Sequence, residues 1–299
     1  EPKNIIYMIG DGMGYNHVAA ANLYDSGQTR YQVEGEVGSD LSMADGEAAQ
    51  VYEGAGWNKL AMTTFQEGNS YDVERAWADH DYVNESYTDS AAAGTAMATG
   101  VKTSNGSLGV DSASEARENT SERAKEQGKA AGVVSDVPFS HATPAAWASH
   151  VESRNDYHEI ARQMISGDLD VIMGAGHPFF NDDNERRDAA VYQYIAEAEH
   201  NSLVAGETDF EYFDNDEAFA ALANGEVEAD TRYFGLAQVA STLQQGRSGQ
   251  STAPYSIPQN DVVDLATMSK GALNVLGQDE DGFHLMIEGG AIDWAGHAN

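Results

Sequence analysis

The sequence contains no cysteine in its 299 residues. Disulfide bonds, thiolate metal ligands and cysteine nucleophiles are therefore all excluded. Any bound metal ion must be held by histidine and by oxygen ligands. The lack of cysteine does not determine the compartment, because an oxidising compartment permits disulfides without requiring them.

Basic residues are scarce: 16 Lys and Arg stand against 49 Asp and Glu, which gives a formal net charge of −33. Phosphate backbones would repel such a chain, so coating of nucleic acid is disfavoured. The hydrophobic fraction is still 41%, which indicates a folded protein with an acidic surface. At 1 M salt the Debye length is about 3 Å and the surface repulsion is screened. We therefore predict a halophilic or halotolerant source, the alternative being an unusually acidic mesophilic protein.

Long apolar runs are also missing, and none approaches the roughly 20 residues of a membrane span. Short strand-like and helix-like segments alternate instead, which predicts one α/β domain over residues 1–299 with a doubly wound, mostly parallel sheet. Residues 178–260 are expected to form an irregular insertion, and 244–258 a loop. We expect strands at 4–9, 130–134, 170–173, 232–236 and 283–287, and helices at 89–98, 115–127, 156–165, 187–199, 214–223 and 261–276.

Three polar residues follow expected strands: Asp11, Thr143 and Glu288. In open α/β sheets, ligands bind beyond the carboxyl ends of the strands. Two carboxylates and a hydroxyl suit Mg²⁺, with water completing the shell. Taken singly, each residue has an ordinary structural alternative: a turn residue, a loop residue or a helix cap.

Asp293 and His297 are four residues apart and share one face if that segment is helical. This pair suits Zn²⁺, although a surface hydrogen bond is the commoner reason for the spacing. The preceding Gly289 and Gly290 favour the metal site, because they remove side chains where the backbone would have to approach an ion.

Ser90 lies at the start of the helix expected at 89–98, where serine most often serves as an N-cap. The same position would place its oxygen beside backbone N–H groups and the positive end of the helix dipole. No Gly-x-Ser-x-Gly pattern surrounds it, so a metal ion is the alternative means of activation. The glycines of residues 10–14 match a dinucleotide fingerprint only weakly.

The chain resembles the alkaline phosphatases in five ordered motifs. They are Ile9-Gly-Asp-Gly-Met-Gly14, Thr88-Asp-Ser-Ala-Ala-Ala-Gly-Thr-Ala96, His141-Ala-Thr-Pro-Ala-Ala146, Ser153-Arg154 and Glu288-Gly-Gly-Ala-Ile-Asp-Trp-Ala-Gly-His297. The resemblance implies hydrolysis of small phosphate monoesters through a phosphoserine on Ser90, with two Zn²⁺ and one Mg²⁺ per site. It also implies a periplasmic or secreted protein whose signal peptide has been removed, and a homodimer as one option.

The resemblance assigns a role to each candidate. Asp11 would bridge Mg²⁺ and one Zn²⁺, Thr143 and Glu288 would complete the Mg²⁺ ligands, and Arg154 would hold the phosphoryl oxygens. The metal ligands that it implies are Asp11, Ser90, Thr143, Glu288, Asp293 and His297. His141 and Trp294 resemble the marine-bacterial type and would tune the Mg²⁺ site and phosphate binding.

The family's remaining zinc ligands lie downstream of its Asp-x-x-x-His segment, whereas His297 is close to the last residue given. We therefore expect the 299 residues to be the N-terminal part of a longer chain. Two alternatives stay open. The chain can be a non-catalytic metal- and phosphate-binding fragment that needs a complementing segment, or a phosphodiesterase of the same superfamily.

Overall fold

A computed structural model describes residues 2–27, 33–34, 42–43, 50–54, 56–79, 81–85, 87–249 and 256–298. Contacts between residues divide the chain into two compact units. Unit 1 consists of Glu1–Asp11 and Thr64–Asn299, and unit 2 is Gly12–Thr63. Each is described separately, and the division into domains expected from the sequence stays a prediction.

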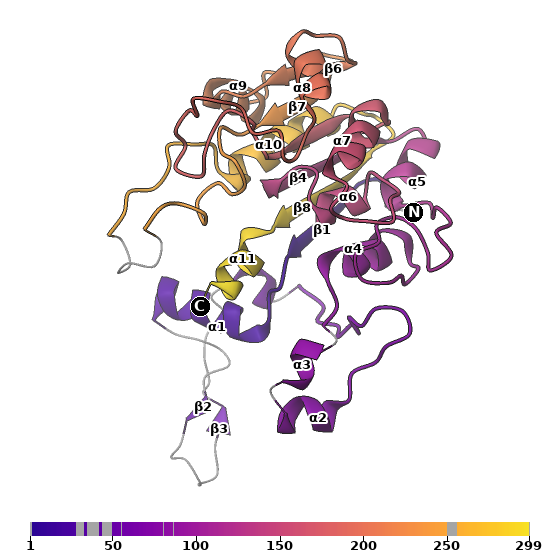
Figure 1. Cartoon of the computed structure of the whole chain (residues 1–299), viewed down its shortest axis with the longest axis vertical. Helices are drawn as coiled ribbons and strands as arrows, with labels where there is room; N and C mark the ends of the chain where they lie inside the picture. Colours follow the sequence, from indigo (N-terminus) through magenta and orange to yellow (C-terminus); the bar gives the residue numbers. More distant parts are fainter. Residues whose placement is uncertain are drawn as a thin grey trace. The chain divides into compact units, whose positions relative to one another are not determined.

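Unit 1 is built on a six-stranded, all-parallel sheet in the order β1-β8-β4-β5-β7-β6 (Figure 1). This arrangement confirms the α/β sheet predicted from the sequence. The strands are β1 (Ile5–Gly10), β4 (Ala130–Pro138), β5 (Val171–Ala175), β6 (Phe210–Phe213), β7 (Arg232–Leu236) and β8 (Phe283–Gly289).

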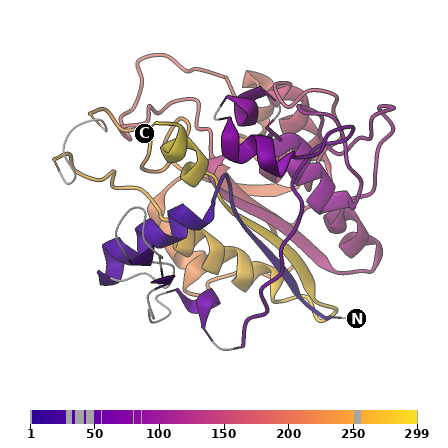
Figure 2. The same ribbon diagram turned by 90° about the horizontal axis from the view of Figure 1, so that it is seen from below.

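Helices cover both faces of the sheet (Figure 2). One apolar core contains Val133 and Met286, and the other contains the neighbouring residues Val134 and Leu285. Successive side chains of a strand point to opposite faces, so a strand buried on both faces must be apolar throughout. This requirement explains the uninterrupted hydrophobic runs of β4 and β8.

The first core is closed by four helices: α4 (Ser90–Thr99), α6 (Ala142–Ala146), α7 (Tyr157–Ser166) and α8 (Glu197–Val204). The second is closed by α9 (Asp216–Ala223) and α10 (Leu265–Leu276). A β-carbon on Gly94 of α4 would lie 3.1 Å from the β-carbon of Ala146 in α6. The small residues expected at 89–98 therefore do allow close helix packing.

The remaining helices of unit 1 are α2 (Val73–Ala78), α3 (Tyr82–Glu85), α5 (Thr120–Glu126) and α11 (Ala291–His297). Unit 2 contains α1 (Tyr15–Ser26), the short antiparallel strands β2 (Val33–Glu34) and β3 (Ser42–Met43), and the 3₁₀ helix η1 (Val51–Glu53). Within unit 2, the buried Asn22 side chain donates to Glu53 Oε2 at 2.9 Å, which joins α1 to η1.

Several expected boundaries were wrong. The helix expected at 115–127 starts only at Thr120, because the Asn119 side chain accepts from the N–H groups of Ser121 and Glu122 and caps it there. The helix expected at 187–199 is α8, which begins at Glu197. Strand β6 was missed, since its four residues are too few to show a period. Residues 178–260, expected to be irregular, contain α8, β6, α9 and β7, and 250–255 of the expected loop lie outside the described residues.

No helix in the described ranges is both long and apolar enough to cross a bilayer. This agrees with the lack of long hydrophobic runs in the sequence.

Candidate active site

Polar residues gather where β1, β8 and β4 end. Glu288 pairs in register with Ile9 on one side and with Ser135 on the other, and the Asp11 N–H donates to the Gly289 carbonyl at 3.2 Å. Because the three strands are parallel and adjacent, Asp11, Ser135 and Glu288 share one edge of the sheet. The prediction that Asp11 and Glu288 follow neighbouring strands is confirmed.

Glu288 is fully buried at this edge. Ser135 Oγ donates to its Oε2 at 2.5 Å, whereas Oε1 has no hydrogen-bond partner among the described residues. Burial, together with the charges of Asp11 and Asp136, raises the pKa of Glu288 to about 8, although hydrogen bonds from Ser135 and Thr143 act in the opposite direction. A buried carboxylate with an unpartnered oxygen is costly unless a cation lies against it.

Thr143 is the third member of this set. It lies in α6 and is buried, and its hydroxyl hydrogen-bonds to Glu288. The structure therefore brings Thr143 and Glu288 together, as the sequence predicted.

Ser90 is the first residue of α4, and Asp89 rather than Ser90 caps the helix. One Asp89 oxygen accepts from the Ala92 N–H at 2.9 Å. The serine hydroxyl is thus released from capping and instead donates to Asp11 Oδ2 at 2.9 Å. The alternative that Ser90 serves only as a cap is wrong, and its oxygen lies beside the carboxylate that the sequence had singled out.

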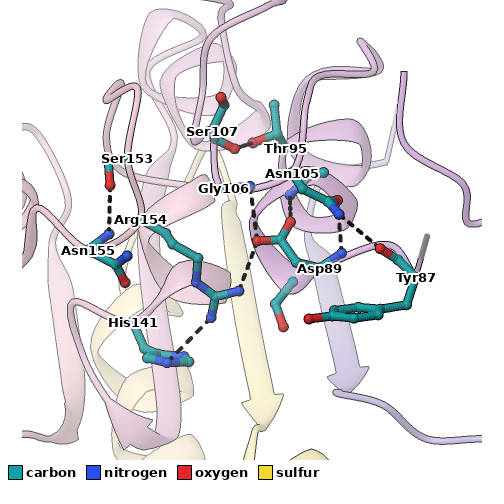
Figure 3. A network of polar contacts seen from close by, with 12 residues as sticks. Tyr87, Asp89, Thr95, Asn105, Gly106, Ser107, His141, Ser153, Arg154 and Asn155 are labelled. Carbon is teal, nitrogen blue, oxygen red and sulfur yellow. Dashed lines mark hydrogen bonds and ion pairs between the residues drawn. The ribbon is translucent and has the colours of Figure 1, made fainter. Parts of the chain in front are cut away.

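Asp89 also connects Ser90 to Arg154 (Figure 3). Its second oxygen accepts from Arg154 Nη1 at 3.1 Å and from the Gly106 N–H at 3.0 Å. The Asn105 side chain accepts from the Asp89 N–H at 3.0 Å and donates to the Tyr87 carbonyl at 2.8 Å. The backbone before Ser90 and the guanidinium of Arg154 are therefore fixed by the same contacts.

His141 lies directly beside Arg154, with 3.4 Å between His141 Nε2 and Arg154 Nη2 (Figure 3). Burial and the Arg154 charge lower the pKa of His141 to about 3, so the ring is neutral. A guanidinium can only donate, so Nε2 accepts and we assign the proton to Nδ1, which has no partner in the described structure. The Trp294 ring packs edge-on at 5.5 Å from the His141 ring, so Arg154, His141 and Trp294 form one group.

Asp293 and His297 both lie on α11, which confirms that their segment is helical. His297 Nε2 and Asp293 Oδ2 are 3.4 Å apart, and the His297 side chain is 78% exposed. Two ligands are fewer than the three or four protein ligands of a typical zinc site. This geometry fits both a partial metal site and the surface pair that the sequence left open.

A divalent cation fits the Asp11, Thr143 and Glu288 set better than any neutral group. Three carboxylates, those of Asp11, Asp136 and Glu288, influence one another there, and burial raises the pKa of Asp136 as well. A hard cation would offset this charge and give Glu288 Oε1 a partner. The described residues contain no cluster of three or more histidine and acidic side chains arranged for a metal, because the third donor here is a hydroxyl.

Sequence reasoning missed Ser135 and Asp136. Asp136 Oδ1 accepts from the N–H groups of Gly290 and Ala291 at 2.7 and 3.1 Å, which fixes the turn between β8 and α11. A β-carbon on Gly290 would lie 2.6 Å from Val137, so the close approach requires glycine. Both missed residues directly follow the apolar run 130–134, and that position was the available signal.

Three comparisons agree on the nearest relatives. The family model for "Alkaline phosphatase" matches residues 2–299. The chain is 30% identical over 306 residues to alkaline phosphatase 4 of Bacillus subtilis, covering 100% of this chain and 53% of that protein. It is 29% identical to the alkaline phosphatase of Escherichia coli, covering 99% and 62%. The chain thus spans between half and two thirds of the length of these relatives.

A solved structure has the same fold. It is the cold-active alkaline phosphatase from the psychrophile Shewanella sp., with a TM-score of 0.62 and 26% identity, covering 99% of this chain and 58% of that one.

Proposed function

This chain belongs to the alkaline phosphatase family, and we propose that it carries the nucleophile, the phosphate-binding arginine and the magnesium ligands of a phosphate monoester hydrolase. The observation that supports this most is the Ser90 hydroxyl, held by Asp11 at a helix start and joined through Asp89 to Arg154. A serine in that position faces a group that can bind two free phosphoryl oxygens.

The reaction that we propose begins with Ser90 Oγ. This oxygen attacks phosphorus in line, a bond from Oγ to phosphorus forms, and the bond to the ester oxygen breaks. Water then hydrolyses the phosphoserine and releases inorganic phosphate. Asp11 orients Oγ through its hydrogen bond, and Arg154 holds the non-bridging oxygens as a two-pronged donor.

We propose that Asp11, Thr143 and Glu288 hold Mg²⁺, and that Asp11, Ser90, Asp293 and His297 contribute to two Zn²⁺ sites. When bound, these cations would supply Lewis-acid stabilisation of the reacting oxygens. His141 and Trp294 do not contact the candidate metal ligands in any distance given above. Their contribution is to position Arg154, since His141 meets it at 3.4 Å.

Arg154 favours monoesters over diesters, because a diester has only one free pair of oxygens and its second alcohol would compete for the guanidinium. A periplasmic or secreted location, a homodimer and a halophilic source stay predictions.

Hydrolysis of p-nitrophenyl phosphate with Zn²⁺ and Mg²⁺ in high salt tests the proposal. We expect turnover that is lost in Ser90→Ala and falls strongly in Arg154→Ala, with slower hydrolysis of bis(p-nitrophenyl) phosphate. Asp264→Asn is a matched control, because Asp264 caps α10 as Asp89 caps α4. Phosphate binding without turnover would instead favour the non-catalytic alternative, and faster diester hydrolysis would favour a phosphodiesterase.

A further inference from the structure

A groove of roughly 590 Å³ opens beside the phosphate-binding residues. We call it the Tyr157 groove and define it by residues 155–159, Arg162, Tyr192 and Gln193. Its volume is within the range of about 300–1,000 Å³ that small-molecule sites occupy.

The Tyr157 groove is joined to Arg154 in two ways. Asn155 directly follows Arg154 in the chain, and the Asn155 N–H donates to Ser153 Oγ at 3.3 Å (Figure 3). The Tyr157 ring lies nearly parallel to the His141 ring, at 6.3 Å and 16°, and His141 in turn meets Arg154. The aromatic wall of the groove therefore continues into the group that holds the proposed phosphate.

Both walls of the groove are held in place. His158 Nε2, on α7, hydrogen-bonds to the backbone carbonyl of Tyr192 at 2.8 Å. Tyr157 is also packed against Tyr194 at 5.0 Å, edge to face. Two tyrosine rings, Tyr157 and Tyr192, thus line a hollow whose sides are already connected, which lowers the ordering cost of binding.

The charges of the groove disfavour an anionic occupant. Arg162 is its one guanidinium, and this side chain is already paired with Glu159 and with Glu199 at 3.1 Å. Asp156 and Glu159 line the same hollow. A second phosphate or a carboxylate would meet these acids, whereas an uncharged ring would not.

We propose that the Tyr157 groove receives the alcohol part of the ester and selects monoesters of flat, uncharged alcohols, such as aryl monophosphates and nucleoside monophosphates, over di- and triphosphates. This inference rests on the proposed function, because the phosphoryl group must lie at Arg154. Stacking on an aromatic side chain contributes roughly a 2- to 10-fold gain in affinity.

The test is calorimetric binding of phenylphosphonate and methylphosphonate to the chain in the presence of Zn²⁺ and Mg²⁺. The two probes carry the same phosphonate and differ by the ring. We expect phenylphosphonate to bind roughly 2- to 10-fold more tightly, Tyr192→Ala to abolish this preference, and Tyr192→Phe to retain it. Val191→Ala is the matched control, since Val191 precedes Tyr192, is 47% exposed and does not line the groove.

A para-sulfonate on the phenyl ring should remove the preference in the unmodified chain, because the added charge would meet Asp156 and Glu159. Equal affinity for the two phosphonates, or a preference that persists in Tyr192→Ala, would overturn the groove assignment. If p-nitrophenyl phosphate is still hydrolysed in that case, the proposed function stands. Failure of both phosphonates to bind would overturn the groove and count against the phosphate site as well.

Discussion

Replacement of Asp89 by asparagine separates the two tasks of this side chain. One oxygen caps α4 by accepting from the Ala92 N–H, and the other accepts from Arg154 Nη1 and the Gly106 N–H. Asparagine can keep the cap, because its carbonyl oxygen is an equally good acceptor there. Its amide nitrogen, however, would face two donors, so Asp89→Asn should lose both of the other contacts.

The expected loss is substantial because the pair is largely buried, with 15% of the Asp89 side chain and 21% of the Arg154 side chain exposed. Hydrogen bonds to a charged group contribute about 1.5–3 kcal/mol each, and neighbouring bonds do not add fully. We therefore expect Asp89→Asn to lower the free energy of unfolding by about 2–4 kcal/mol. Phosphate affinity should fall as well, because Arg154 loses its fixed orientation.

Urea unfolding and phosphate titration by calorimetry measure the two effects. Asp264→Asn is the control, since Asp264 caps α10 by accepting from the Thr267 N–H at 2.7 Å, and no salt bridge of this carboxylate is found in the described structure. It should cost less than about 1 kcal/mol. If Asp89→Asn were no more destabilising than Asp264→Asn and bound phosphate equally well, the role assigned to Asp89 would be refuted.

Three further perturbations test other parts of the structure. The hydrogen bond with Glu122 raises the pKa of His150, and burial of Glu122 is outweighed by that bond, so the pKa of Glu122 is lowered. The His150 contribution is present below its ordinary pKa of 6.5 and is lost as pH rises, and the Glu122 contribution is present above 4.5 and is lost as pH falls. The stability difference between the wild type and His150→Gln, measured in urea, should therefore be largest between these values, and a difference independent of pH from 4 to 8 would contradict this. Gly94→Val should lower the melting temperature through overpacking against Ala146, at a cost of about 1–3 kcal/mol, and an unchanged melting temperature would show that α4 and α6 can separate freely. Mg²⁺ should raise the melting temperature of the wild type, by about 2.7 kcal/mol of stability at 100 times its Kd, but should raise that of Glu288→Gln far less, and equal shifts would exclude Glu288 as a ligand.

The sequence predicted those parts of the fold that depend on hydrophobic runs and on strong capping residues. Strand β7 was found at its observed bounds, 232–236, and α4 within one residue. Boundaries set by a single side-chain contact were missed, as at Asn119, where a capping hydrogen bond rather than composition decides that α5 starts at Thr120.

The candidate site was predictable where a polar residue directly follows an apolar strand. Asp11 and Glu288 fit that rule, and the structure places them on neighbouring strands. Asp136 fits the rule too, but its partners, the N–H groups of Gly290 and Ala291, are far away in the sequence. The capping of α4 by Asp89 also could not be told from composition, because aspartate and serine are both strong N-caps and only the backbone dihedral angles decide between them.

The most direct test of the central claim is to identify the residue that receives phosphate. The chain would be incubated with p-nitrophenyl phosphate, Zn²⁺ and Mg²⁺, quenched in acid, and its peptides analysed by mass spectrometry. Our account predicts phosphate on Ser90 in the wild type and none in Ser90→Ala, with loss of turnover in that variant. Phosphate on another residue, or undiminished hydrolysis by Ser90→Ala, would contradict it.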